Sequence, residues 1–278
     1  MLTSKLTAHK AIQAQRELDQ LMRRSSAAEF SRLRGAEREM QAVAGVFRRA
    51  TVLKGSEASE QNVRKLAAER RLDEYRYLHF ATHGVLDSKA PMQSALILSQ
   101  DQLPNPVDQV LAGKPTYSGQ LTADQILRDW RLHADLVTLS ACETGLGKYA
   151  GGEGYLGFSQ ALFLSGARSV VLSMWKVDDA STALLMTRFY ENLMGRRPGL
   201  KKPLTKSQAL AEAKGWLRGL KAEDAEQVGG GLIRGLDTDT ARGTKRAQPA
   251  KQAGAPTSLY PYSHPYYWAA FILIGDPG

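Results

Sequence analysis

The stretch LHFATHGVLD, residues 78–87, sets an apolar run directly against a histidine and a glycine. The aromatic residues of YRYLHFA, residues 75–81, predict a buried strand, and the chain leaves that strand through Thr82, His83 and Gly84. In an open parallel sheet the loops at the carboxyl ends of the strands converge on a crevice. The question raised by this stretch is therefore what a histidine does at such an edge.

Further strands and helices alternate along the rest of the chain. Strand-like segments occur at 51–53, 94–99, 135–142, 169–175 and 268–275. Helical spacing or capping signals occur around Met40, after Ser59, at 121–130 where Thr122 and Gln125 have capping-box spacing, and at 154–166, 179–194 and 205–220. This alternation predicts the α/β class, with a mostly parallel sheet that helices cover on both faces.

Composition limits the function classes. The chain has 278 residues, of which 43% are hydrophobic, and it has no apolar run of about 18 residues and no signal-peptide core near its start, so we expect a cytoplasmic protein with no membrane partner. Its single cysteine, Cys142, excludes an internal disulfide and a cysteine-based zinc cage. No spacing of ligands and no glycine-rich lysine motif supports a metal or a nucleotide, so no cofactor is expected.

The formal net charge of +9 is unevenly distributed, because residues 1–49 hold ten Lys or Arg against five acids. Residues 1–31 are interpreted as a basic helical arm or the remnant of an upstream helical region. Without a zinc-finger pattern or an aromatic RNA-binding signature, we expect no nucleic-acid partner and interpret the arm as a solvated face that contacts a neighbouring domain or a regulatory or sensor partner. Residues 32–278 form the main predicted domain.

Residues 222–257 break the alternation of strands and helices. They carry three successive glycines, scattered charges and two prolines without sustained periodicity, which predicts a flexible insertion. Residues 100–120 are predicted to form a second, shorter excursion.

His83 and Cys142 end two predicted strands and are expected to share one edge of the sheet. A cysteine thiol with a pKa of about 8.5 is mostly protonated near neutrality, and an imidazole can take its proton. The same imidazole can return the proton to a leaving amine. The backbone N–H groups of Gly84 and Cys142 are candidate donors to an oxyanion, since glycine lets a substrate carbonyl approach the backbone. From the residues alone, Cys142 is either a core residue or a nucleophile.

The other candidate residues have plainer interpretations. His79, inside the predicted strand, is expected to be a satisfied core or face residue, and His133 and His264 are expected to be structural. Glu153 either braces the loop after Cys142 or begins a helix.

The pattern resembles the caspase-like cysteine peptidases, clan CD, in which one strand ends in His-Gly and a later strand in Ala-Cys-x-x-Gly. The fuller resemblance is to CHAT domains, the bacterial branch near separase, and rests on GAEREMQAV, LHFATHG, LSACETGLG, GGEGYLGFSQALFLSGARSVVLSMWKVDD and HPYYWAAFILIGDP. It implies a caspase-like three-layer α/β/α sandwich and a thiol protease. His83 would be the general base and acid, Cys142 the nucleophile, and Gly84 part of the oxyanion hole.

The resemblance also implies a specificity pocket. The stretch from Trp175 to Asp179 is similar to the separase segment whose acidic residue binds an arginine before the cut bond. Asp179 is then the acid of the P1 pocket, with Asp178 as the alternative and Trp175 beside them, and a basic P1 residue is expected. An acid just past a strand can equally cap the following helix.

Two functions remain open at this stage. One is an endopeptidase that cuts a protein substrate through an acyl-enzyme, and that either processes itself near Arg234, Arg242, Lys245 or Arg246 or is activated by a partner. The other is a catalytically silent interaction or signalling module with the same fold.

Overall fold

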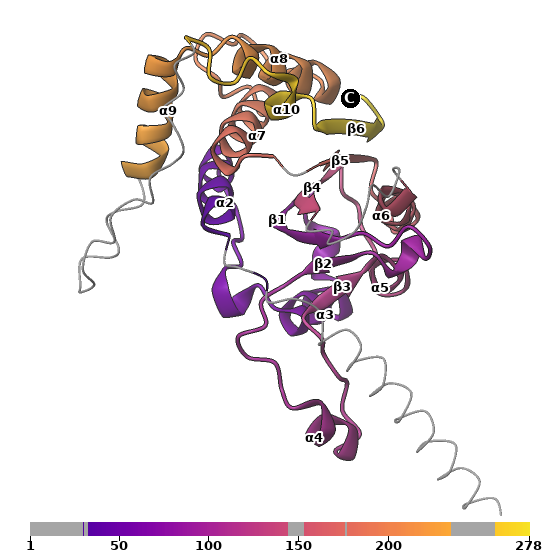
Figure 1. Cartoon of the computed structure of the whole chain (residues 1–278). Helices are drawn as coiled ribbons and strands as arrows, with labels where there is room; N and C mark the ends of the chain where they lie inside the picture. Colours follow the sequence, from indigo (N-terminus) through magenta and orange to yellow (C-terminus); the bar gives the residue numbers. More distant parts are fainter. Residues whose placement is uncertain (1–29, 31–32, 144–152, 176, 235–258) are drawn as a thin grey trace, which may run out of the picture.

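The computed structural model describes residues 30, 33–143, 153–175, 177–234 and 259–278. Within them a six-stranded sheet forms the centre of the molecule, in the order β3-β2-β1-β4-β5-β6 (Figure 1). The strands are β1 (Tyr77–Val85), β2 (Ala95–Ile97), β3 (Gln120–Thr122), β4 (Leu136–Glu143), β5 (Ser169–Ser173) and β6 (Phe271–Gly275).

The sheet is mixed. The central pairs β1/β4 and β4/β5 are parallel, while β1/β2, β2/β3 and β5/β6 are antiparallel. Four of the six strands, β1, β3, β4 and β5, consequently point the same way, and the predicted parallel sheet is confirmed at its centre. The two strands of opposite direction are β2, between β1 and β3, and β6, at the other edge of the sheet, which pairs with β5 although residues 174–270 separate the two strands.

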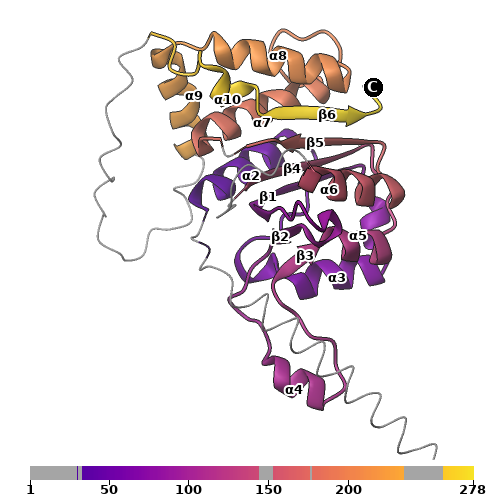
Figure 2. The same ribbon diagram turned by 45° about the vertical axis from the view of Figure 1, so that its right-hand side comes forward.

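Helices cover both faces of the sheet and make three layers, as Figure 2 shows. One face packs against α3 (Glu60–Ala68), α5 (Ala123–Asp129) and α6 (Glu153–Leu164), and the other against α2 (Arg34–Val46), α7 (Asp179–Leu193) and α8 (Lys206–Arg218). Neighbouring strand residues alternate between the two cores: Val137 and Val170 face the first, and Leu136 and Val171 the second. Because both faces are buried, the central strands are apolar throughout.

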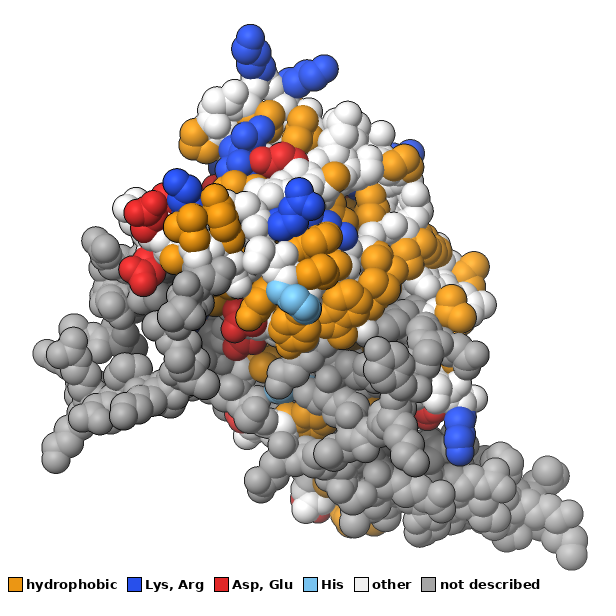
Figure 3. All heavy atoms as spheres, turned by 45° about the horizontal axis from the view of Figure 1, so that its top comes forward, with side chains coloured by type: hydrophobic (Ala, Val, Ile, Leu, Met, Phe, Trp, Pro, Cys, Tyr) orange, Lys and Arg blue, Asp and Glu red, His pale blue; other side chains and the backbone are white. Residues whose placement is uncertain are grey.

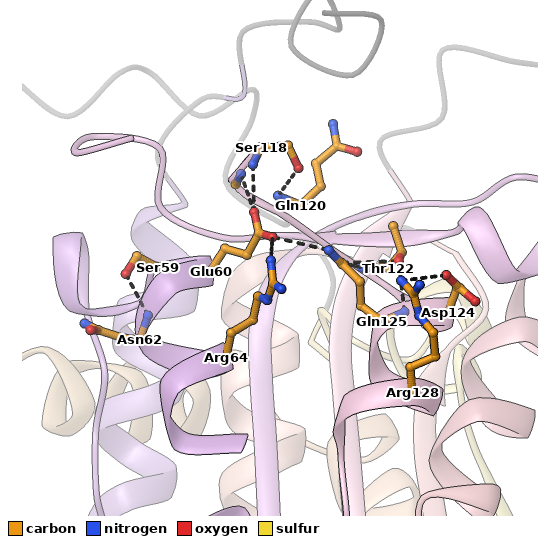
Figure 4. Close-up of polar contacts among 11 residues, drawn as sticks. Ser59, Glu60, Asn62, Arg64, Ser118, Gln120, Thr122, Asp124, Gln125 and Arg128 are labelled. Atoms are coloured by element: carbon orange, nitrogen blue, oxygen red, sulfur yellow. Dashed lines mark hydrogen bonds and ion pairs between the residues drawn. The ribbon is translucent and has the colours of Figure 1, made fainter. Parts of the chain in front are cut away.

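The edge at β3 is held by a buried carboxylate. Glu60, 1% exposed, accepts hydrogen bonds from the backbone N–H groups of Ser118 at 2.8 Å and Gly119 at 2.9 Å, and from Gln125 Nε2 at 3.3 Å (Figure 4). The predicted cap Ser59 and the predicted capping box of Thr122 and Gln125 are both confirmed. These contacts join α3, α5 and the chain entering β3, since buried backbone donors require partners.

Several sequence-based boundaries were wrong. Residues 51–53 form no strand, and the third strand on this side of the sheet is instead β3, a three-residue segment too short for a periodic signal. The excursion at 100–120 contains a short helix, α4 (Pro106–Leu111), on an arm that projects from the sheet (Figure 1). Three single 3-10 turns, η1 (Gly55–Glu57), η2 (Arg71–Glu74) and η3 (Pro91–Gln93), join the elements on this side.

The insertion predicted at 222–257 begins with a helix, so the prediction of a flexible segment was wrong for residues 222–234. This helix, α9 (Ala222–Arg234), has Glu223 and Asp224 in its first turn, and Ala225 packs against the second core. Acids at the helix N-terminus and this packing offset the low helix propensity of the glycines. Residues 235–258 lie outside the described residues, as do 1–29 and 31–32 of the predicted arm.

The predicted final strand, 268–275, begins three residues later, because Trp268 is the last residue of a short helix. A four-residue helix, α10 (Pro265–Trp268), is followed by β6. His264 caps α10, with Nδ1 accepting from the Tyr266 N–H at 3.2 Å, so its predicted structural role is confirmed.

Candidate active site

The two residues predicted as a dyad occupy one register position in the sheet. In the parallel ladder of β1 and β4, His83 pairs with Cys142 and Gly84 with Glu143, both near the carboxyl ends of their strands. Paired residues of neighbouring parallel strands belong to the same face of a sheet. The backbone of Cys142 is part of β4, while its side chain lies outside the described part of the chain.

His83 lies on the inner part of the sheet, between β2 and β4, and is 9% exposed. The ring of Phe30, just before α2, packs on its imidazole with ring centroids 5.4 Å apart and planes tilted by 40°. On the opposite face of β1, the Thr82 hydroxyl donates to the carbonyl oxygen of Ile97 in β2. Gly84 is buried and belongs to β1, so both strands run past the predicted site residues rather than ending before them.

A chain of buried hydrogen bonds lies four residues upstream of this pair. His79 Nε2 is 3.0 Å from Glu39 Oε1 of α2, and His79 Nδ1 is 3.2 Å from the Tyr190 hydroxyl of α7. The Tyr190 hydroxyl is also 2.8 Å from Thr138 Oγ1 of β4, and burial raises its pKa. His79 is thus a satisfied core residue, as predicted.

Glu39 is the residue of this network that the sequence analysis missed. It is 4% exposed and stands four residues before the buried Val43, on the helix stripe that faces the core. A carboxylate at a core position of an amphipathic helix is an available signal, because such a group is rarely buried without a partner.

The predicted acids of the P1 pocket have different surroundings. Asp178 is the N-cap of α7: its carboxylate accepts from the Ser181 N–H at 2.9 Å. Asp179 is the first residue of the helix, is exposed, and lies against α2 so closely that a Cβ at Gly35 would overlap its side chain. Asp178, and not Asp179, therefore caps α7.

Trp175 connects β5 to an aromatic surface at α10. Its indole N–H donates to the carbonyl oxygen of Tyr266 at 3.1 Å, and the Tyr267 ring makes edge contacts with Tyr262 and Tyr266. Tyr260 and Tyr266 are exposed, and Figure 3 shows hydrophobic side chains gathered on the face toward α8 and α10. Burial raises the pKa of Tyr262, and the charge of Asp178 adds to the rise.

The remaining candidates do not join the pair. His133 is exposed in the segment before β4, and Glu153 begins α6, with its side chain outside the described part of the chain. Among the described residues no group of three or more His, Cys, Asp or Glu is arranged to hold a metal ion. In the same residues, no helix combines the length and the apolar character needed to cross a bilayer.

A six-stranded sheet between helical layers, with a histidine and a cysteine paired across its two central strands, is the arrangement of a caspase-like α/β protein. A model of the CHAT domain matches residues 3–276, so the chain belongs to the CHAT domain family, which includes caspase-like peptidases. None of the curated proteins compared with the chain matches it.

Proposed function

We propose that the protein is a cysteine endopeptidase that cleaves protein substrates through a dyad of His83 and Cys142. The observation that carries the proposal is the register: the two residues are backbone partners in adjacent parallel strands. Neighbouring strands of a sheet lie about 4.8 Å apart, a separation that an imidazole and a thiol can bridge.

The chemistry follows from this placement. His83 takes the proton of the Cys142 thiol, and the thiolate attacks the carbonyl carbon of the scissile bond. When the tetrahedral intermediate collapses, the C–N bond breaks and His83 gives its proton to the leaving amine. Water, activated by the same imidazole, then hydrolyses the thioester and restores the thiol. The N–H groups of Gly84 and Cys142 are the proposed donors to the oxyanion.

We propose Asp179 as the acid that selects a P1 arginine or lysine. Asp178 is occupied as the cap of α7, which leaves the neighbouring carboxylate for a ligand. Trp175, two residues past the end of β5, would form a wall of the pocket. A guanidinium can contact a carboxylate through two parallel hydrogen bonds, so arginine should be preferred over lysine.

We further propose that the protein acts in the cytoplasm and that a partner protein controls its peptidase activity by binding the arm at residues 1–31. The contact of Phe30 with the His83 imidazole supports this control. A partner that displaces Phe30 would change the surroundings of the general base, so the isolated chain is expected to be less active than the complex.

The proposal is tested by cleavage of fluorogenic peptides that differ only at P1, with Arg, Lys, Asp and Leu. We expect cleavage after Arg and Lys and no cleavage by Cys142→Ala. Asp179→Ala should lose about fivefold in kcat/KM after Arg and Lys, because an ion pair of an exposed carboxylate contributes about 1 kcal/mol. Asp178→Asn, which retains a capping side chain, is the matched control and should keep the P1 preference. A Cys142→Ala variant as active as the wild type would refute the dyad.

A further inference from the structure

The hydrogen-bonded chain of Glu39, His79, Tyr190 and Thr138 links the two strands that carry the proposed dyad. His79 of β1 pairs with Thr138 of β4 in the same ladder in which His83 pairs with Cys142. The Tyr190 hydroxyl contacts side chains on both strands, at 3.2 Å from His79 Nδ1 and 2.8 Å from Thr138 Oγ1. It is thus a cross-link between β1 and β4, about 13 Å along the strands from the dyad.

The Glu39 carboxylate, which can only accept, suits one direction of hydrogen bonding along this chain. One assignment gives every group a partner: the Glu39 carboxylate accepts from His79 Nε2–H, and Nδ1 of the same ring accepts from the Tyr190 hydroxyl. The Tyr190 oxygen in turn accepts from the Thr138 hydroxyl. Each group has a partner in this arrangement, and Thr138 and Tyr190 are fully buried, so the loss of one group leaves its neighbour unsatisfied in the core.

Glu39 ties this cross-link to α2. The same helix follows Phe30, whose ring packs on the His83 imidazole, and its first turn lies against Asp179 through Gly35. Two contacts therefore join this region to β1. Glu39 of α2 is hydrogen-bonded to His79, and Phe30, which precedes α2 in the chain, packs its ring on His83.

We infer that Glu39 is a positioning residue for His83: through His79 and Tyr190 it holds α2 and the strands β1 and β4 in the alignment that the dyad requires. The inference rests on the proposed function for its consequence in catalysis. The effect of Glu39 on the position of the His83 imidazole can be measured whether or not the protein is a peptidase.

Cys142 is the only cysteine in the chain, so alkylation of the full-length protein by iodoacetamide reports on one thiol. We expect the Cys142 thiol of the wild type to react with an apparent pKa below about 8.5, the ordinary value for cysteine.

The Glu39→Ala variant should slow alkylation of Cys142 at pH 6.5 by roughly 10- to 100-fold, the range expected for a misplaced reacting group. Glu39→Gln, which retains an acceptor for His79 Nε2–H, should recover most of the rate. Full pH profiles of all variants are compared, because Glu39 on α2, Tyr190 on α7 and Tyr77 on β1 are titratable groups beside His79.

The matched control is Glu60→Ala. Glu60 is also a buried carboxylate with several hydrogen bonds, but it lies in the other helical layer, at β3 (Figure 4). Its loss should lower the unfolding temperature as much as the loss of Glu39 while leaving the alkylation profile of Cys142 unchanged. An equal shift of the profile in both variants would show that Glu39 acts only through overall stability and would overturn the inference.

A second measurement separates the inference from the proposed function. The chain has five histidines, so the imidazole signals in a 15N NMR spectrum can be assigned with His83→Ala. We expect Glu39→Ala, but not Glu60→Ala, to move the His83 signal, and an unmoved signal overturns the positioning role. If His83→Ala instead leaves the alkylation of Cys142 unchanged, the dyad is refuted, and the NMR result still decides the positioning role of Glu39.

Discussion

At the scale of single residues, Glu212 shows how an ion network joins two helices on the outer layer. Its carboxylate accepts from Arg188 of α7 at 2.7 and 3.1 Å and from Asn192. Partial burial alone would raise the pKa of Glu212, but the hydrogen bonds from Arg188 and Asn192 and the charges of Arg188 and Arg197 outweigh burial, so the pKa lies below its ordinary value of 4.5. Folding therefore favours the ionised carboxylate.

This lowered pKa predicts a dependence of stability on pH. A carboxyl whose pKa is lower in the folded state adds stability above its unfolded pKa and loses it as the pH falls through the folded value. We expect the wild type to unfold a few degrees above Glu212→Gln at pH 7, since a partly exposed network contributes about 1 kcal/mol. Thermal unfolding from pH 7 to pH 3 should show the difference constant down to about pH 5 and shrinking below it. A difference that grows toward pH 3 would contradict the lowered pKa.

At the scale of elements, α6 approaches the 3-10 turn η3 through a helical glycine. A Cβ at Gly157 would overlap the carbonyl oxygen of Pro91, whereas a Cβ at Gly215 in α8 would meet no atom within 4 Å. Alanine in place of glycine ordinarily stabilises a helix interior by about 1 kcal/mol. We predict the opposite sign at Gly157, where backbone must move away from backbone at a cost of about 1–3 kcal/mol.

Urea unfolding of the two variants checks this prediction. Gly215→Ala should unfold at a higher urea concentration than the wild type and Gly157→Ala at a lower one. Because both substitutions add the same methyl group inside a helix, intrinsic propensity cancels in the comparison. A stabilised Gly157→Ala would mean that α6 and η3 do not pack at this distance.

The elements differ in how far the sequence predicts them. The central strands and the capped helices were predicted because burial on both faces and the caps of Ser59 and Thr122 leave local signals. The three-residue strand β3 and helix α9 were missed, since β3 is defined by its pairing with β2 and α9 by tertiary packing of Ala225. The sequence predicted that His83 and Cys142 lie together because both end strands at the same edge of the sheet. The Glu39 network could not be predicted in the same way, because it depends on tertiary contacts between α2, β1, β4 and α7.

At the scale of the whole molecule, the order of the strands governs what self-processing would do. A cut after Arg234, Arg242, Lys245 or Arg246 separates β6 and α10 from the rest of the chain, because both follow residue 258. The strand β6 pairs with β5 over five residues and buries Phe271 in the second core. The C-terminal piece should therefore stay bound to the cut protein, held by main-chain hydrogen bonds and apolar burial.

Self-processing thus predicts a specific difference between two mass measurements. On incubation of the wild type, intact mass under denaturing conditions should show two pieces that sum to the chain plus one water, while the native mass increases only by that water. Cys142→Ala should remain a single chain under both conditions. The denatured masses identify the cut site, and replacing the basic residue there with glutamine should prevent the cut without moving the unfolding temperature. A wild-type chain that keeps one mass beside Cys142→Ala, in the presence of peptide cleavage by the same sample, would show that residues 234–246 are not a substrate of the site.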